Sequence, residues 1–169
     1  MNMRLLLASL AFVAVAAAAQ DLPNKFDPGR DPVKDVAAAV AKAKAQGKRV
    51  IVDVGGEWCS WCHILDRFID ANADVLALRD RHYVWVKVNW SKENKNEAFL
   101  ARYPAIKGYP HLFVLDADGK LVHSQDTGEL ESGKSYDLAK MTAFFTKWAP
   151  APRQQAAAPA PTARARAPA

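Results

Sequence analysis

The chain has 169 residues and a formal net charge of +5. Four arginines near its two ends, Arg4, Arg153, Arg164 and Arg166, account for most of this excess, since the remainder has 19 basic against 18 acidic residues. The central part is therefore nearly neutral and has no basic stripe with interleaved aromatic residues, which argues against a nucleic-acid-binding protein.

The first 19 residues have the pattern of a secretory signal peptide. Arg4 precedes an apolar run from Leu5 to Ala19 that ends in small residues matching A-x-A, which predicts cleavage before Gln20. An uncleaved anchor is the alternative, although the run is short for a spanning helix. We therefore expect export to the periplasm, with no integral membrane span after cleavage, into an oxidising compartment where a disulfide persists.

The next elements are predicted to be a helix and a buried strand. Asp31 is a typical N-cap and Pro32 suits the first helical position, so the Ala-rich segment Val33–Gln46 is predicted to be helical. The almost wholly apolar, β-branched run Arg49–Val54 indicates a strand covered on both faces. The two cysteines follow this strand directly.

A second helix is predicted to begin at the cysteines, break near Asn72 and resume over Val75–Leu78. The later predicted elements are strand Tyr83–Trp90, helix Asn96–Tyr103, strand Pro110–Leu115, a hairpin turn at 116–119, strand Leu121–Ser124 and helix Tyr136–Trp148. The last helix carries an apolar stripe that we assign to the core. This order predicts one α/β domain over residues 20–149, a central mixed sheet with helices on both faces and a C-terminal β-hairpin plus helix.

The C-terminal segment from Pro150 onward is rich in alanine and proline and contains no large apolar residue. Such a composition cannot supply the apolar burial that offsets the entropy of ordering the chain. We expect residues 150–169 to be a disordered tail.

The two cysteines, Cys59 and Cys62, allow several chemistries. They close no sizeable loop, so a purely structural disulfide is weakly favoured. Followed by His63, they match the c-type haem attachment motif C-x-x-C-H, although the surrounding strands do not suit a haem protein. A zinc site would have to recruit His63, His82, His111 or His123, which show no paired spacing. We therefore expect no metal and no cofactor beyond the cysteine pair.

A redox dithiol is favoured, because a cysteine at a helix N-terminus meets unpaired N–H groups that stabilise its thiolate. Cys59 holds that place and would be the exposed, nucleophilic sulfur, while Cys62, one turn further in, would resolve a mixed disulfide. Asp53 lies within an apolar strand, where loss of water raises the pKa of a carboxyl group, so it can act as a base. A turn-capping role for Asp53 is the alternative.

The segment V-D-V-G-G-E-W-C-S-W-C, followed by G-Y-P-H-L-F-V-L-D-A-D-G-K, resembles the thioredoxin superfamily over about Val33–Trp148. The resemblance implies that Asp53 takes the proton of Cys62, that Lys87 supports it, and that the Tyr109–Pro110 bond is cis. By the same resemblance Pro110 packs against the disulfide and the Tyr109 backbone pairs with an extended substrate segment. A trans proline in a turn is the alternative.

Trp58 and Trp61 are expected to supply apolar contacts around the sulfurs. The intervening residues Ser60 and Trp61 differ from those of thioredoxin and of strong oxidants, so the redox direction stays open. The pattern W-C-x-W-C-H resembles the periplasmic branch related to the C-terminal domain of the thiol-disulfide interchange reductase, which favours reduction. We expect a monomer whose partners are protein thiols and disulfides and an unidentified protein that recycles it, while a non-catalytic binding module is the rival function.

Overall fold

A computed structural model describes residues 21–151 of the chain. The predicted signal peptide (1–19) and residues 152–169 of the predicted tail lie outside the described part. The elements are α1 (Pro32–Gln46), β1 (Arg49–Gly55), α2 (Ser60–Ala71), α3 (Ala73–His82), β2 (Tyr83–Asn89), α4 (Glu97–Leu100), β3 (His111–Leu115), β4 (Leu121–Asp126), the 3-10 turn η1 (Thr127–Leu130), β5 (Glu131–Ser132), β6 (Ser135–Tyr136) and α5 (Leu138–Lys147).

The central sheet has four strands in the order β2-β1-β3-β4. Strands β1 and β2 are parallel, whereas the β1–β3 and β3–β4 pairs are antiparallel. The predicted mixed sheet is thus confirmed. The parallel pair places Asp53 opposite Lys87 in the register, so these two residues are brought side by side by the sheet itself.

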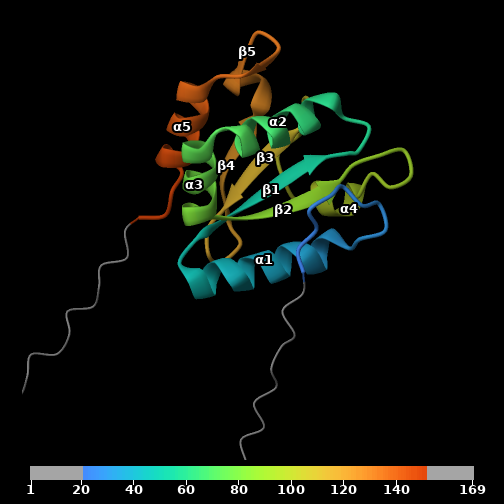
Figure 1. Ribbon diagram of the computed structural model, residues 1–169. Helices are drawn as coiled ribbons and strands as arrows, with labels where there is room; N and C mark the ends of the chain where they lie inside the picture. The colour runs from blue at the N-terminus through green and yellow to red at the C-terminus, as the bar shows by residue number, and fades with distance from the viewer. Residues whose placement is uncertain (1–20, 152–169) are drawn as a thin grey trace, which may run out of the picture.

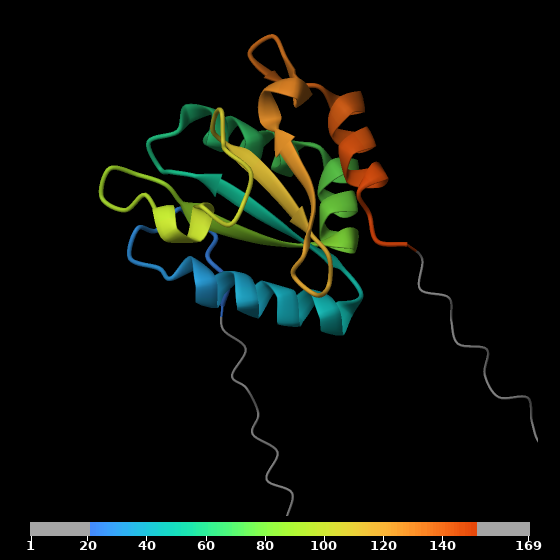
Figure 2. The ribbon, with the colours of Figure 1, turned by 180° about the vertical axis from the view of Figure 1, so that it is seen from behind.

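Helices cover both faces of the sheet, as Figures 1 and 2 show: α1 lies on one face, and α2, α3 and α5 lie on the other. Side chains alternate along a strand, so neighbouring residues of β1 enter different layers. Val50, Val52 and Val54 pack with α1, while Ile51 packs with α2 and α5. By the same alternation Asp53 is directed toward α2, the helix that begins at the cysteines.

The helix boundaries agree with the sequence prediction at several points. Asp31 caps α1 by accepting hydrogen bonds from the backbone N–H groups of residues 33 and 34. Asn72 separates α2 from α3, where the break was expected. In α5 the stripe side chains Met141, Phe144 and Phe145 are buried, which confirms their place in the core, whereas Leu138 of the same predicted stripe is 52% exposed and does not belong to it.

Other predicted boundaries are wrong. The predicted helix Asn96–Tyr103 shrinks to the single turn α4, because Asn96 is left-handed (φ 50°) and Pro104 disfavours helical geometry before it. Helix α5 starts at Leu138 rather than Tyr136, which instead belongs to the unpredicted hairpin β5–β6. Strands of two residues leave no periodic signal in a sequence. No helix in the range 21–151 combines the length and apolarity needed to cross a membrane.

Candidate functional site

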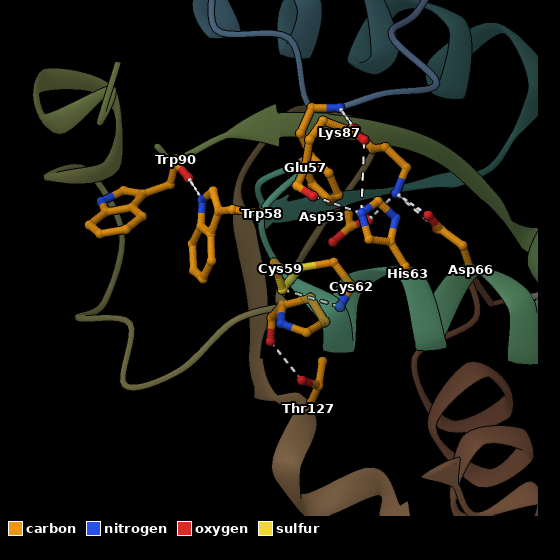
Figure 3. Close-up of a disulfide and its surroundings, with 12 residues drawn as sticks. Asp53, Glu57, Trp58, Cys59, Cys62, His63, Asp66, Lys87, Trp90 and Thr127 are labelled. Atoms are coloured by element: carbon orange, nitrogen blue, oxygen red, sulfur yellow. Dashed lines mark hydrogen bonds and ion pairs between the residues drawn. A yellow bond between two sulfur atoms is a disulfide. The ribbon is translucent and has the colours of Figure 1, made fainter. Parts of the chain in front are cut away.

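The two cysteines form a disulfide at the N-terminus of α2, where β1 ends. Cys59 is the N-cap of the helix, and its sulfur accepts a hydrogen bond from the backbone N–H of Cys62 at 3.1 Å. Figure 3 shows the pair at the start of the helix. The predicted position of Cys59 is therefore confirmed, and its sulfur lies where the unpaired N–H groups of a helix stabilise negative charge.

The expectation that Cys59 is exposed is wrong for this disulfide form. Cys59 is 3% exposed and Cys62 only 1%. Phe26 forms one cluster with the two cysteines, and Trp61 and Tyr109 pack against it. A reaction at Cys59 therefore requires a substrate to reach a sulfur enclosed by aromatic rings.

Phe26 belongs to a segment that sequence reasoning passed over, the N-terminal arm (residues 21–31). The ring is 2% exposed, and its backbone N–H donates to Oε1 of Glu57 at 2.9 Å. A Cβ at Gly55 would lie 2.5 Å from the Cys62 sulfur and 3.0 Å from Cζ of Phe26, so only glycine leaves room for both. An isolated phenylalanine among polar residues gave no periodic signal that could have identified it.

Asp53 and Lys87 form a buried ion pair on neighbouring strands. Lys87 Nζ lies 3.0 Å from Oδ2 of Asp53, and the indole of Trp85 donates to the same oxygen at 3.2 Å. The other oxygen, Oδ1, is buried without a hydrogen-bond partner. Asp53 and Gly55 are two residues apart on β1, so they lie on the same face of the sheet, about 7 Å apart along the strand. Gly55 in turn borders the Cys62 sulfur.

A third charged residue, Asp66 of α2, completes this cluster and was not predicted. Lys87 Nζ lies 2.8 Å and 3.0 Å from its two carboxylate oxygens. Figure 3 shows Lys87 directed toward both acids. Two carboxylates thus share one ammonium group, and the cluster carries an excess negative charge whenever Asp53 is ionised. Asp66 lies four residues after Cys62. Its contact with Lys87 could not be read from the sequence, because it depends on how the chain crosses from α2 to β2.

Burial raises the pKa of Asp53, and the attraction and hydrogen bond of Lys87 oppose that rise without cancelling it. For Lys87, burial acts to lower the pKa, but the nearby carboxylates of Asp53 and Asp66 outweigh it, so the pKa is raised. The lysine therefore stays protonated near neutral pH, whereas Asp53 is the group whose protonation can change. An aspartate with a raised pKa is suited to accept a thiol proton.

The Tyr109–Pro110 peptide bond is cis, as the resemblance implied. Thr127 of η1 donates a hydrogen bond from its hydroxyl to the Pro110 carbonyl at 2.6 Å and is 2% exposed. Figure 3 shows Thr127 on the side of the disulfide opposite Asp53. Sequence reasoning missed Thr127, since nothing in its local sequence indicates a contact with a residue 17 positions away.

The predicted tryptophans lie on two sides of the disulfide. Trp58 is 56% exposed and makes edge-on contacts with Trp90 and Tyr109, with ring centroids 5.8 Å apart in each pair. Trp61 borders the cysteines and packs edge-on against Tyr136 of the small hairpin at 5.7 Å. Trp90, at the end of β2, is an aromatic neighbour that the sequence analysis did not single out.

His63, the residue behind the haem interpretation, is engaged elsewhere: its Nε2 lies 2.9 Å from the carbonyl oxygen of Glu57. Both sulfurs are joined to each other, so neither carries a thioether bond in this form. Across residues 21–151 no three histidine, cysteine or acidic side chains lie close enough together to hold a metal ion.

Comparison with known proteins agrees with this geometry. A family model described as thioredoxin-like matches residues 31–117, just over half of the chain. The thiol:disulfide interchange protein DsbD of Colwellia psychrerythraea is 28% identical over 97 residues, which covers 56% of this chain and 16% of that protein. DsbD of a Pseudomonas species is 33% identical over 106 residues, or 60% of this chain and 18% of that protein. The chain therefore spans less than a fifth of the length of these relatives.

A solved structure extends the likeness to the whole fold. The disulphide isomerase from Xylella fastidiosa superposes with a TM-score of 0.63 at 28% identity, covering 76% of this chain and 98% of that one. The fold, the C-x-x-C disulfide and these likenesses together mark a thiol-disulfide oxidoreductase. The chain belongs to the thioredoxin-like family.

Proposed function

We propose that this oxidoreductase reduces disulfide bonds of other proteins in the periplasm, through Cys59 and Cys62. The observation that carries the proposal is the position of the cysteine pair. Cys59 caps a helix N-terminus, and the Cys62 sulfur borders Gly55, which lies two residues after the buried, lysine-paired Asp53 on the same face of β1. In this proposal the apolar N-terminal segment directs export and is removed before Gln20, leaving residues 20–149 as the domain that exchanges disulfides.

In the reduced protein, the Cys59 thiolate attacks one sulfur of a substrate disulfide. A mixed disulfide forms, the substrate S–S bond breaks, and the released sulfur leaves as a thiolate that takes a proton from water. Asp53 then accepts the proton of the Cys62 thiol, and the Cys62 thiolate attacks the Cys59 sulfur. The second substrate sulfur leaves, the Cys59–Cys62 disulfide forms, and two electrons have passed to the substrate.

The surrounding residues have supporting roles. Lys87 limits the rise in the pKa of Asp53 that burial causes. Without its attraction, the Asp53 carboxyl would stay protonated over a wider pH range and could not accept a proton there. Trp61 packs against the sulfurs, and Trp58 adjoins Cys59 and contacts Tyr109. The turn at Tyr109 and Pro110 offers the platform along which an extended substrate segment lies. An unidentified reductant, a protein dithiol, returns the pair to the dithiol form.

The charges near the disulfide support the reducing direction. A dithiol is a strong oxidant in its disulfide form when the protein stabilises the thiolate of the reduced form. Here two carboxylates share one lysine, and when Asp53 is ionised their excess negative charge opposes a thiolate at Cys62, whose sulfur borders Gly55 on the Asp53 side. We therefore expect a low equilibrium potential against glutathione, near about −270 mV rather than about −120 mV.

Trapping experiments test the proposed function. The Cys62→Ser protein should accumulate a mixed disulfide with a substrate protein through Cys59, whereas Cys59→Ser should trap little, because attack begins at Cys59. The adducts are separated on non-reducing gels, and reducing agent must release them. Absence of adducts with Cys62→Ser, together with no reduction of protein disulfides by the native chain, would favour a non-catalytic binding module.

A further inference from the structure

A pocket of about 590 Å³ lies next to Trp58, the residue that precedes Cys59. Apolar groups from three separate segments form most of its wall: Phe26 and Pro28 of the N-terminal arm, Trp58, and Trp90. Figure 3 shows Trp58 and Trp90 side by side, to one side of the disulfide. The sulfur chemistry described above makes no use of this pocket.

The charged residues of the pocket do not make it an ion site. The Glu57 carboxylate is already engaged by the backbone N–H of Phe26 at 2.9 Å. Lys92 and Glu93 carry opposite charges and are exposed to solvent. The pocket therefore offers an apolar interior with a polar rim, the composition of sites that take apolar groups.

The wall is held in place before any ligand arrives. The Trp58 indole N–H donates to the Trp90 carbonyl at 2.8 Å, although the side chain is 56% exposed. A Cβ at Gly56 would collide with the Trp58 indole and lie 2.7 Å from the Trp90 carbonyl oxygen, so glycine is what lets the two tryptophans approach. An exposed aromatic side chain held rigidly beside a hollow is typical of a recognition site.

We propose that this pocket binds a large apolar side chain, aromatic or aliphatic, on the polypeptide segment that carries the substrate disulfide. The inference rests on the proposed function and adds a specificity site to it. Trp58 adjoins Cys59 in the chain and contacts Tyr109, the first residue of the cis turn. An extended segment that crosses the disulfide, advancing about 3.3 Å per residue, therefore passes the pocket within one or two residues of its cysteine.

The size of the surface favours a single side chain over a second copy of the chain. The exposed large apolar side chains of the described residues are Val33, Trp58, Leu121 and Leu138, which lie on separate elements. Only Trp58 lies at the pocket. One exposed ring and one hollow fall short of the roughly 1,000 Å² that a stable protein interface buries.

The test uses two short peptides, each with one intramolecular disulfide and identical except that the residues flanking one cysteine are Phe or Ser. The protein is reduced, freed of reductant and mixed with peptide below saturation, and peptide thiols are measured after an acid quench. We expect the Phe peptide to be reduced at least about tenfold faster, since burying a large apolar side chain contributes that much or more.

Pro28→Asp is the informative variant, because Pro28 is exposed and the change places a carboxylate at the pocket without touching the core. It should lower the Phe preference to below about threefold, since an apolar ring would have to strip water from the new carboxylate. The Ser peptide should react at its former rate. Asn24→Asp is the matched control: it adds the same charge to the same arm outside this pocket, and should keep the full preference.

Equal rates for the two peptides, or a preference that survives Pro28→Asp, would overturn the inference while leaving the proposed function intact. Failure to reduce either peptide would overturn the proposed function and the inference with it. A Phe preference that emerges only after deletion of residues 152–169, or only where sedimentation shows monomers, would assign the pocket to the tail or to a second copy and overturn the proposal.

Discussion

The ammonium group of Lys87 lies 3.0 Å from Oδ2 of Asp53, with the two side chains 7% and 1% exposed. The strand register alone places these residues opposite each other, and Asp66 then joins from α2. Burial raises the pKa of Asp53, and the attraction of Lys87 opposes that rise without cancelling it.

Asp53→Asn should slow the second step of disulfide exchange near neutral pH and spare the first. An amide cannot accept the Cys62 proton, whereas the attack by Cys59 does not depend on it, and a positioned base contributes about a hundredfold or more. Rapid mixing of reduced protein with substrate, followed by an acid quench, should show a mixed disulfide that persists. Asp70→Asn, which changes an exposed aspartate of α2, is the control. Equal slowing of both steps would make Asp53 a structural residue.

The same substitution should change how stability depends on pH in the oxidised protein, where the cysteines do not titrate. Burial raises the pKa of Asp53 in the native state above its ordinary value of 3.8. At pH values between 3.8 and the raised pKa, the native state therefore holds a proton that the unfolded chain has lost. Stability from this group therefore falls as pH rises through that interval. The raised pKa of Lys87 acts only above pH 10.5.

We thus expect the stability of Asp53→Asn relative to the native chain to increase from about pH 4 toward neutrality. Urea unfolding at several pH values measures this difference. Asp70→Asn should show no such trend, because that side chain is exposed. A difference that stays constant, or that decreases as pH rises, would contradict the burial of an ionisable Asp53.

Thr127→Val should destabilise the protein by about 1–3 kcal/mol, because the buried Pro110 carbonyl loses its donor while the side-chain shape is kept. Thr127→Ser retains the hydroxyl and should cost less. Chemical unfolding gives both values, and the Val variant should also reduce disulfides more slowly, because the proposed substrate platform at Pro110 loses its hydrogen bond. A larger loss in Thr127→Ser than in Thr127→Val would show that the methyl group, rather than the hydrogen bond, is what matters.

Cys59 in the reduced protein should react with one equivalent of iodoacetamide near pH 6, where an ordinary thiol is almost fully protonated. The reason is its place at the N-terminus of α2, whose N–H groups stabilise a thiolate. Cys62 should lag behind, and mass spectrometry of the digested protein distinguishes the two sites. Free cysteine provides the reference rate, and a Cys59 no faster than this reference would contradict the assignment.

Expression together with haem-attachment machinery separates the two interpretations of C-x-x-C-H, and we expect colourless protein. A covalent product with haem absorption would instead favour the haem interpretation of His63 and the two cysteines.

The sequence by itself was sufficient for features that depend on neighbours along the chain. An N-cap followed by proline predicted the start of α1, and a β-branched run predicted β1. The spacing of the cysteines before an apolar helical stripe placed them at a helix N-terminus. Asp53 stood out because a charged residue interrupts an apolar strand, and that strand is indeed buried.

Only the tertiary structure decided which distant groups surround the sulfurs. Phe26 reaches the disulfide from before α1, Asp66 meets Lys87 across 21 positions, and Thr127 holds Pro110 from the unpredicted segment after β4. Cys59 is enclosed for the same reason. Local periodicity records only which face of an element is buried, whereas these contacts depend on how the sheet and its crossovers bring separate elements together.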